Sequence, residues 1–136
     1  MPVVIEWDSR FSVGNSVLDA QHQKLLGLCN SLAHCLAADP QEARFKCHEI
    51  LHQFIVYAQE HFRIEEKFLE RSGYTDLAHH LREHRAFEEK TADWAFAATM
   101  NSLDLLEVQR FLAIWWSNHI LVSDMQFKPL LESKRS

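Results

Sequence analysis

Glycine and proline are scarce in this sequence, with three of each among 136 residues. A β-sandwich or β-barrel needs a turn signal every ~8 to 12 residues, and glycine and proline supply most of those signals. Their scarcity argues against such folds and favours an all-α protein. The length fits a single domain over residues 1–136, since domains are most common at roughly 100 to 150 residues.

Three other absences narrow the class of protein. No continuous apolar run reaches the ~18 residues that a membrane span needs, so no membrane partner is expected. The net charge is −5, whereas nucleic-acid-binding domains normally carry a basic patch, so no nucleic-acid partner is expected. The amino terminus lacks the basic and apolar segments of an export signal, and the expected location is therefore cytoplasmic.

Cysteine is also rare. Cys29, Cys35 and Cys47 are odd in number and lack C-x-x-C spacing, so they build neither a complete disulfide framework nor a zinc knuckle. We expect them to be reduced and mostly structural, with Cys29 and Cys47 serving as small core residues.

Turn and capping signals divide the sequence into an arm and four helical segments. Asp39-Pro40 separates the first two helices, because the residue before proline disfavours the α region, and Ser72-Gly73 ends the second. Apolar residues recur at alternating steps of four and three, the seam of helices packed about 20° from antiparallel. With short connections, this predicts an up-down-up-down antiparallel four-helix bundle with an N-terminal arm. The predicted segments are the arm 1–16 and helices over about residues 17–38, 40–72, 75–101 and 103–128.

Histidine, by contrast, is abundant, with nine residues. Helical phase, at about 100° per residue, places five of them and one glutamate on the seams, in one layer near one end of the bundle. This inward set is His22, His61, Glu65, His80, His84 and His119. Each unpartnered buried polar side chain costs roughly 2 to 7 kcal/mol, while a domain is stable by only ~5 to 15 kcal/mol. A metal centre would satisfy all six groups together.

A second metal-binding pattern needs an interpretation. His48-Glu49-Ile50-Leu51-His52 matches the H-E-x-x-H helix of zinc proteases. Its two histidines lie about 100° and 140° from the seam of their helix, so they should face solvent or a helix flank. A third ligand would have to come from elsewhere. We interpret the pattern as a surface coincidence.

Several spaced motifs follow one another over almost the whole chain. They are Trp7 with Phe11-Ser12-Val13-Gly14, Asp19-Ala-Gln-His22, His61-Phe-Arg-Ile-Glu65-Glu66 with Ser72-Gly73-Tyr74, His80-Leu-Arg-Glu-His84-Arg-Ala-Phe87, and Trp115-Trp-Ser-Asn-His119-Ile120 with Asp124 and Pro129-Leu130. In this combination the sequence resembles the hemerythrin family, specifically the bacterial single-domain bacteriohemerythrins. The resemblance is specific, because several motifs in the right order are much rarer than any one of them.

The resemblance implies a non-haem di-iron centre, with two Fe ions (Fe2+ or Fe3+) joined by an oxo or hydroxo bridge. By position, the implied ligands are, for one iron, His80, His84 and His119; for the other, His22 and His61; and for both, as bridges, Glu65 and Asp124. One iron is then six-coordinate, whereas the other keeps one open position. An open position is what ligand binding requires.

The function implied by the resemblance is reversible dioxygen binding, for oxygen storage or delivery to an oxygen-consuming enzyme. Small anions such as azide would bind the oxidised form. Five imidazoles and two carboxylates favour binding over oxygen activation, so at most a weak enzymatic side activity is expected. The alternatives are an oxygen or redox sensor that acts through a protein partner, a di-iron peroxidase or nitric oxide reductase, and a bundle that binds adventitious zinc.

The resemblance also places Phe62, Trp115, Trp116 and Ile120 around the oxygen pocket. Trp116 is a departure, because the family usually has an aliphatic residue three positions before the last histidine.

Asp124 follows His119 by five residues, which in a regular α-helix leaves it roughly 140° off the seam that continues through Val122. Since the family has the same spacing, we expect a local irregularity there, such as a π-type turn.

Overall fold

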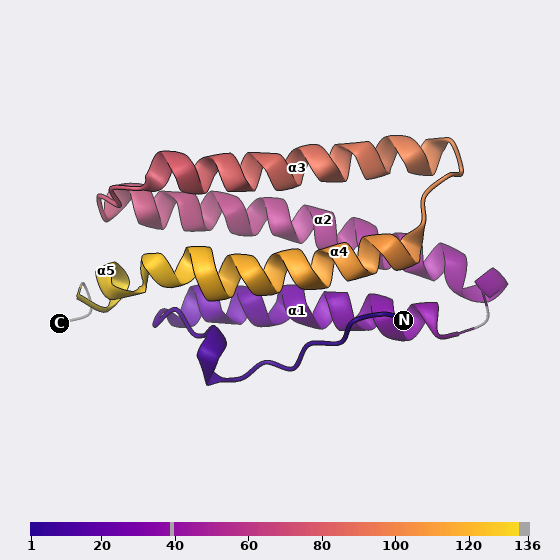
Figure 1. The fold of residues 1–136 in the computed structure, drawn as a ribbon, viewed down its shortest axis with the longest axis horizontal. Helices are drawn as coiled ribbons and strands as arrows, with labels where there is room; N and C mark the ends of the chain where they lie inside the picture. Colours follow the sequence, from indigo (N-terminus) through magenta and orange to yellow (C-terminus); the bar gives the residue numbers. More distant parts are fainter. Residues whose placement is uncertain (39, 134–136) are drawn as a thin grey trace.

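Four long helices run side by side along the molecule, each reversing the direction of the one before (Figure 1). The computed structural model describes residues 1–38 and 40–133, so Asp39 lies outside the described residues. Within them there is no strand, and the predicted four-helix bundle is confirmed. The long helices are Ser16–Leu36 (α1), Pro40–Arg71 (α2), Leu77–Thr99 (α3) and Leu105–Asn118 (α4).

The helices begin and end where local side chains complete their hydrogen bonds. Asn15 accepts from two backbone N–H groups at the start of α1, and Asp104 does the same at the start of α4. Asp76 precedes α3 but forms no side-chain cap. After α2, Gly73 adopts φ +72° while the Tyr74 N–H donates to the Leu69 carbonyl at 3.0 Å, a Schellman ending that requires a left-handed residue.

The fourth predicted helix, expected over residues 103–128, is not continuous. After α4 come a π-helical turn, His119–Ser123, a 3-10 turn, Asp124–Gln126, and a short helix, Lys128–Ser133 (α5). The Asp124 N–H donates to the carbonyl of His119, five residues earlier, and this wide turn brings Asp124 onto the face of His119. The predicted irregularity is confirmed. The same turn makes the placement of Val122 on the seam wrong, since Val122 is 61% exposed.

The arm runs alongside α1 (Figure 1) and is held by two buried or half-buried amide side chains. Gln109 of α4 accepts from the Val3 N–H at 2.8 Å and donates to the Val3 carbonyl at 2.6 Å. Asn30 of α1 pairs with the backbone of Ile5 in the same two-way manner, at 2.9 and 2.7 Å. These pairs fix the arm to two different helices.

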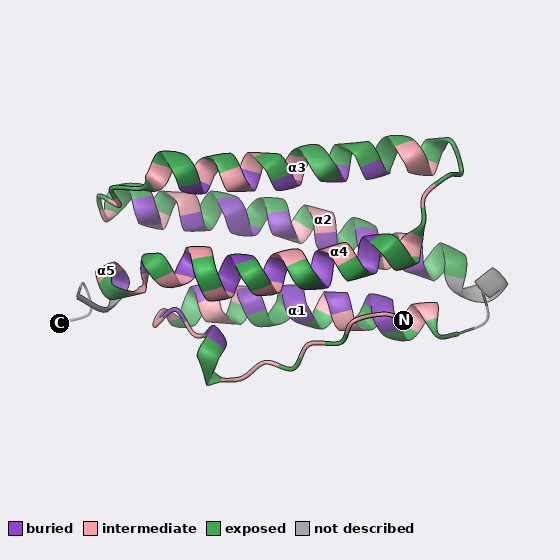
Figure 2. Cartoon of the chain, in the orientation of Figure 1, coloured by how far each residue is buried: buried purple, intermediate pink, exposed green. Residues whose placement is uncertain are grey.

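Buried positions recur along each long helix (Figure 2) and form two apolar clusters. The larger includes Leu25, Phe62 and Trp116, and the smaller includes Leu18 and Phe127. Along the helices, the inward histidines fall between these two clusters. Within the described residues, no helix is long and apolar enough to cross a bilayer.

Candidate metal centre

Seven polar side chains from α1, α2, α3 and the two turns that follow α4 meet in the layer between the two apolar clusters. All are buried, with at most 4% of any residue exposed. They are His22, His61, Glu65, His80, His84, His119 and Asp124. The structure therefore brings together the whole set expected to bind metal.

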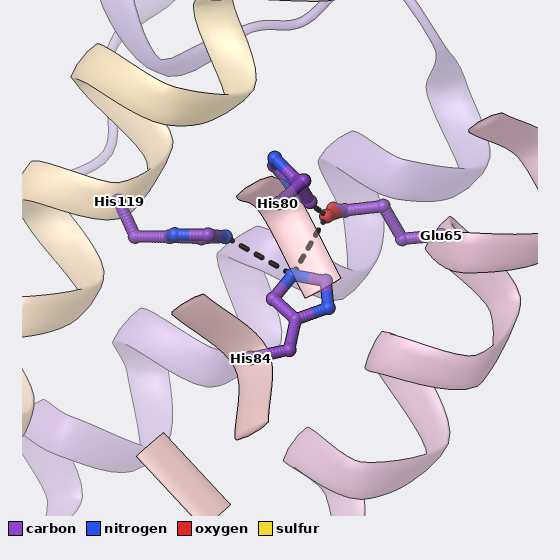
Figure 3. Close-up of side chains that lie close together, drawn as sticks. All are labelled: Glu65, His80, His84 and His119. Atoms are coloured by element: carbon purple, nitrogen blue, oxygen red, sulfur yellow. Dashed lines mark hydrogen bonds and ion pairs between the residues drawn. The ribbon is translucent and has the colours of Figure 1, made fainter. Parts of the chain in front are cut away.

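The first subset, here called the three-imidazole group, comprises His80, His84 and His119. Figure 3 shows His80 and His84 beside Glu65, and His119 directed at His84. Oε1 of Glu65 lies 2.7 Å from His80 Nε2 and 3.2 Å from His84 Nε2. On the other side, Oδ1 of Asp124 lies 3.2 Å from His80 Nε2 and 3.1 Å from His119 Nε2.

The second subset, the two-imidazole group, comprises His22 and His61, whose Nε2 atoms are 3.2 Å apart. It faces the other oxygen of each carboxylate. Oε2 of Glu65 lies 3.1 Å from His61 Nε2 and 3.5 Å from His22 Nε2, and Oδ2 of Asp124 lies 3.2 Å from His22 Nε2. Each carboxylate thus presents one oxygen to each group.

Three of the imidazoles are oriented from outside by acceptors on a neighbouring helix. Nδ1 of His61 donates to Gln21 of α1 at 2.7 Å. Nδ1 of His84 donates to Glu66 of α2 at 2.7 Å, and Nδ1 of His119 donates to Glu83 of α3 at 3.0 Å. A proton held on Nδ1 leaves the Nε2 lone pair of a neutral ring directed into the centre, which is the arrangement of a metal-ligating histidine.

Sequence reasoning did not identify Gln21, Glu66 and Glu83. The signal that could have identified them is their position, since each stands next to an inward residue on its own helix. Gln21 precedes His22, Glu66 follows Glu65, and Glu83 precedes His84. Arg85 reinforces Glu66 through a short ion pair.

The charges of the layer are strongly coupled. Burial by itself lowers the pKa of His22, but the carboxylates of Asp124 and Glu65 outweigh it and raise the pKa to about 9. The same balance raises the pKa of His80 to about 10 and that of His119 to about 9. Burial lowers the pKa of His61.

The acidic groups respond in the opposite direction. Burial alone would raise the pKa of Glu65 and Asp124, but the surrounding imidazoles hold both well below their ordinary values. Outside the layer, the hydrogen bond from His119 lowers the pKa of Glu83 to about 2. Both central carboxyl groups are therefore ionised at neutral pH, which is the state that binds metal.

Unsatisfied atoms test whether the layer fits metal ions. Within the described residues, Oε2 of Glu65 and both oxygens of Asp124 are buried and accept no hydrogen bond. A buried charged acceptor without a donor costs more than the ~1 to 3 kcal/mol of a neutral one. Neutral imidazoles and carboxylates are suitable ligands for divalent iron, so the residues fit a pair of such ions.

The aromatic residues expected around the pocket occupy two different environments. Phe62 and Trp116 are fully buried and stacked on each other at 5.3 Å between centroids, with Ile120 in the same apolar cluster. The ring of Phe62 also stacks on His84 at 3.9 Å, and Trp116 lies 5.8 Å from His61. Phe62, Trp116 and Ile120 therefore form an apolar boundary beside the histidines.

Trp115 is only half-buried, and its ring stacks on His119 at 4.6 Å with an angle of 12°. Together with Glu83 it lines an open groove of about 600 Å³. It therefore covers the outer side of the three-imidazole group.

The H-E-x-x-H pattern does not form a site. His52 is exposed and His48 is half-buried on α2. Among the residues that the structure describes, neither belongs to a cluster of side chains able to hold a metal ion. The interpretation of a surface coincidence agrees with this arrangement.

Fold and side chains define the class of protein as an antiparallel four-helix bundle with a candidate metal centre in its core. Residues 13–131 match the family model of the hemerythrin HHE cation binding domain. A bacteriohemerythrin from Stenotrophomonas maltophilia is 28% identical over 126 residues, 91% of this chain and 79% of that protein. A hemerythrin-like protein from Naegleria gruberi is 30% identical over 131 residues, 96% of this chain and 97% of that protein.

A crystal structure of wild-type hemerythrin has the same fold. Its TM-score is 0.86 at 26% sequence identity, covering 95% of this chain and 98% of that one. The chain belongs to the hemerythrin family, as its motifs predicted.

Proposed function

We propose that this protein binds dioxygen reversibly at a non-haem di-iron centre, for oxygen storage or delivery to an oxygen-consuming enzyme. In this proposal the three-imidazole group holds one iron and the two-imidazole group the other. Glu65 and Asp124 bridge the pair, because each presents one oxygen to either side. Iron(II) ions bound there would supply the two electrons that reversible dioxygen binding uses.

The observation that carries the proposal is the unequal division of the ligands. Both groups share the same two carboxylates, but one has three imidazoles and the other has two. Equal coordination numbers therefore leave one more position for an external ligand on the side of His22 and His61. A site built only for structure would be closed on both sides.

The surrounding residues suit binding rather than turnover. Phe62, Trp116 and Ile120 are fully buried and exclude the water and anions that promote loss of bound oxygen and oxidation of the iron. Gln21, Glu66 and Glu83 accept hydrogen bonds from Nδ1 of His61, His84 and His119 and so fix the orientation of these rings. These three residues position the imidazoles, and none of the three supplies a free acid or base beside the two-imidazole group.

The decisive experiment is an absorption spectrum of the reduced, iron-loaded protein before and after air is admitted, with iron measured per chain. We expect about two iron atoms per chain, a charge-transfer band that appears with oxygen, and its loss on deoxygenation. Peroxide or nitric oxide turnover with a reductant, without a reversible band, would instead favour an enzyme.

His80→Ala and His79→Ala form a matched pair of variants. The two residues are neighbours on α3, but His80 is 2% exposed and the His79 side chain is 52% exposed. We expect His80→Ala to lose iron and the band, and His79→Ala to keep both. Equal behaviour of the two variants, or zinc in place of iron in every preparation, would contradict the proposal.

A further inference from the structure

The two halves of the candidate metal centre differ on their outer side as well as in their number of imidazoles. In the three-imidazole group, Nδ1 of His84 donates to the carboxylate of Glu66 at 2.7 Å. Nδ1 of His119 donates to the carboxylate of Glu83 at 3.0 Å. Two rings of this group therefore have an anionic acceptor on the nitrogen that faces away from the centre.

Among the described residues, the two-imidazole group has no comparable charge on its outer nitrogens. Nδ1 of His61 donates to the neutral amide oxygen of Gln21 at 2.7 Å, and Nδ1 of His22 is buried without a hydrogen-bond partner in the part of the chain that the structure describes. Both groups share the carboxylates of Glu65 and Asp124, so these do not distinguish them. The difference is one imidazole and two outer carboxylates, all on the side of the three-imidazole group.

An outer carboxylate strengthens a histidine ligand. It polarises the Nδ1–H bond and so raises the basicity of Nε2 in the same ring, and loss of such a partner typically lowers metal affinity about 10-fold to 100-fold. A neutral amide orients a ring in the same way but places no negative charge beside it.

The neighbours of the two outer carboxylates decide how much of each charge reaches its ring. Glu66 is partly compensated, since Arg85 pairs with it closely and Arg63 lies 3.8 Å away. Glu83 contacts His79 at 3.2 Å, but the His79 side chain is 52% exposed, and exposed pairs of this kind contribute little. Glu83 is therefore the residue at which the effect of the outer charge is clearest.

We propose that the two groups bind divalent metal in a fixed order: the three-imidazole group takes the first ion and holds it tightly, and the two-imidazole group takes the second more weakly and exchanges it. If each outer carboxylate contributes the lower figure of about 10-fold, the two together separate the association constants by about 100-fold. The inference rests on the proposed function only in that both place metal in these two groups.

The test is a titration of the metal-free, full-length protein with cobalt(II) under nitrogen, because cobalt(II) accepts the same imidazole and carboxylate ligands. We expect two separate binding steps. A crystal structure with one equivalent of cobalt should show its anomalous peak beside His80, His84 and His119. After two equivalents, dialysis against a weak chelator should leave one ion per chain. Equal peaks in both groups at one equivalent, a single step for both ions, or no binding at all would overturn the proposal.

Two reciprocal variants change the outer charge and keep a hydrogen-bond acceptor in place. Glu83→Gln should lower the first association constant about 10-fold to 100-fold and leave the second within a few-fold, whereas Gln21→Glu should raise the second by a similar factor. Glu89→Gln is the matched control, since it removes the same charge from an exposed position on α3 and should change neither step. Equal effects of Glu83→Gln and Glu89→Gln, or a loss confined to the second step in Glu83→Gln, would also contradict the order.

Cobalt binding needs no dioxygen, so the two proposals can fail separately. Ordered cobalt binding without a reversible oxygen band in the iron-loaded protein would refute the proposed function alone. A reversible oxygen band in a protein whose two groups fill together would refute the order alone.

Discussion

Metal loading of the candidate centre should release protons, in a number that its charges determine. His22, His80 and His119 have pKa values raised to about 9, 10 and 9, mainly because two carboxylates overcome the effect of burial. They are therefore protonated at pH 7 in the metal-free protein. Since a metal-ligating imidazole must be neutral, we expect roughly two to three protons to leave. The upper number, three, counts the imidazoles with a raised pKa. The lower number, two, counts the carboxylates whose charge these protons neutralise.

This stoichiometry fixes the pH dependence of metal affinity. Each released proton raises the apparent association constant about tenfold per pH unit below the pKa. Between pH 7 and pH 8, affinity should therefore increase by about 100-fold to 1,000-fold. The measurement is isothermal titration calorimetry with iron(II) under nitrogen, repeated in buffers of different ionisation enthalpy. The dependence of the measured heat on buffer enthalpy gives the proton number.

A high-pH titration provides the control. At pH 9 the imidazoles with raised pKa values are already partly neutral, so fewer protons should be released than at pH 7. A count near zero at pH 7, with metal bound, would show that the imidazoles are already neutral and that the coupling to Glu65 and Asp124 is not as the structure indicates.

The stability of the metal-free protein should follow the opposite course. A raised histidine pKa contributes stability that is complete below the unfolded value of 6.5 and is lost as pH rises through about 9 to 10. The depressed pKa of Glu65 contributes stability above its unfolded value of 4.5 and loses it in acid. We expect the melting temperature to be highest between these unfolded values and to fall toward pH 10. A melting temperature that rises from pH 6.5 to pH 10 would refute this.

Three further predictions concern single residues. Glu66→Gln weakens the acceptor of His84 Nδ1, so metal affinity should fall by about 10-fold to 100-fold; unchanged affinity would reduce Glu66 to a surface ion-pair partner. Trp116→Leu replaces a fully buried indole near His61, so azide binding to the oxidised, iron-loaded protein should become faster, and unchanged kinetics would remove Trp116 from the pocket. Gln109→Leu removes both hydrogen bonds to the Val3 backbone, each worth about 0.5 to 1.5 kcal/mol, and amide exchange of the arm should accelerate; unaltered exchange would show that the arm is held elsewhere.

The fold and most of the candidate centre follow from local rules, because helical phase is enough to select inward residues on a straight helix. It fails where the helix is not regular. The wide turn from His119 to Ser123 carries Asp124 inward and Val122 outward, and phase alone assigned both incorrectly; only the resemblance indicated Asp124. Glu66 and Glu83 could not be recognised either, since residues one step from a seam look like ordinary surface carboxylates.

Glu66 and Glu83 nevertheless couple the orientation of each helix to that of the next element. One residue along a helix turns the side chain by about 100°, so when Glu65 points into the bundle, Glu66 points at the adjacent helix and meets His84. Rotation of α2 would therefore move Glu65 out of the centre. It would also break the hydrogen bond that orients the ring of His84 on α3. These outer hydrogen bonds join α1 to α2, α2 to α3, and α3 to the π-helical turn after α4. No such bond returns to α1, because Nδ1 of His22 has no hydrogen-bond acceptor among the described residues. The two-imidazole group therefore has one ring, His61, that is hydrogen-bonded on its outer nitrogen, and one ring, His22, whose polar contacts are all on its inner nitrogen. In the proposed di-iron centre this is the side with the additional open position, so the ring that lacks an outer hydrogen bond would lie where an external molecule binds.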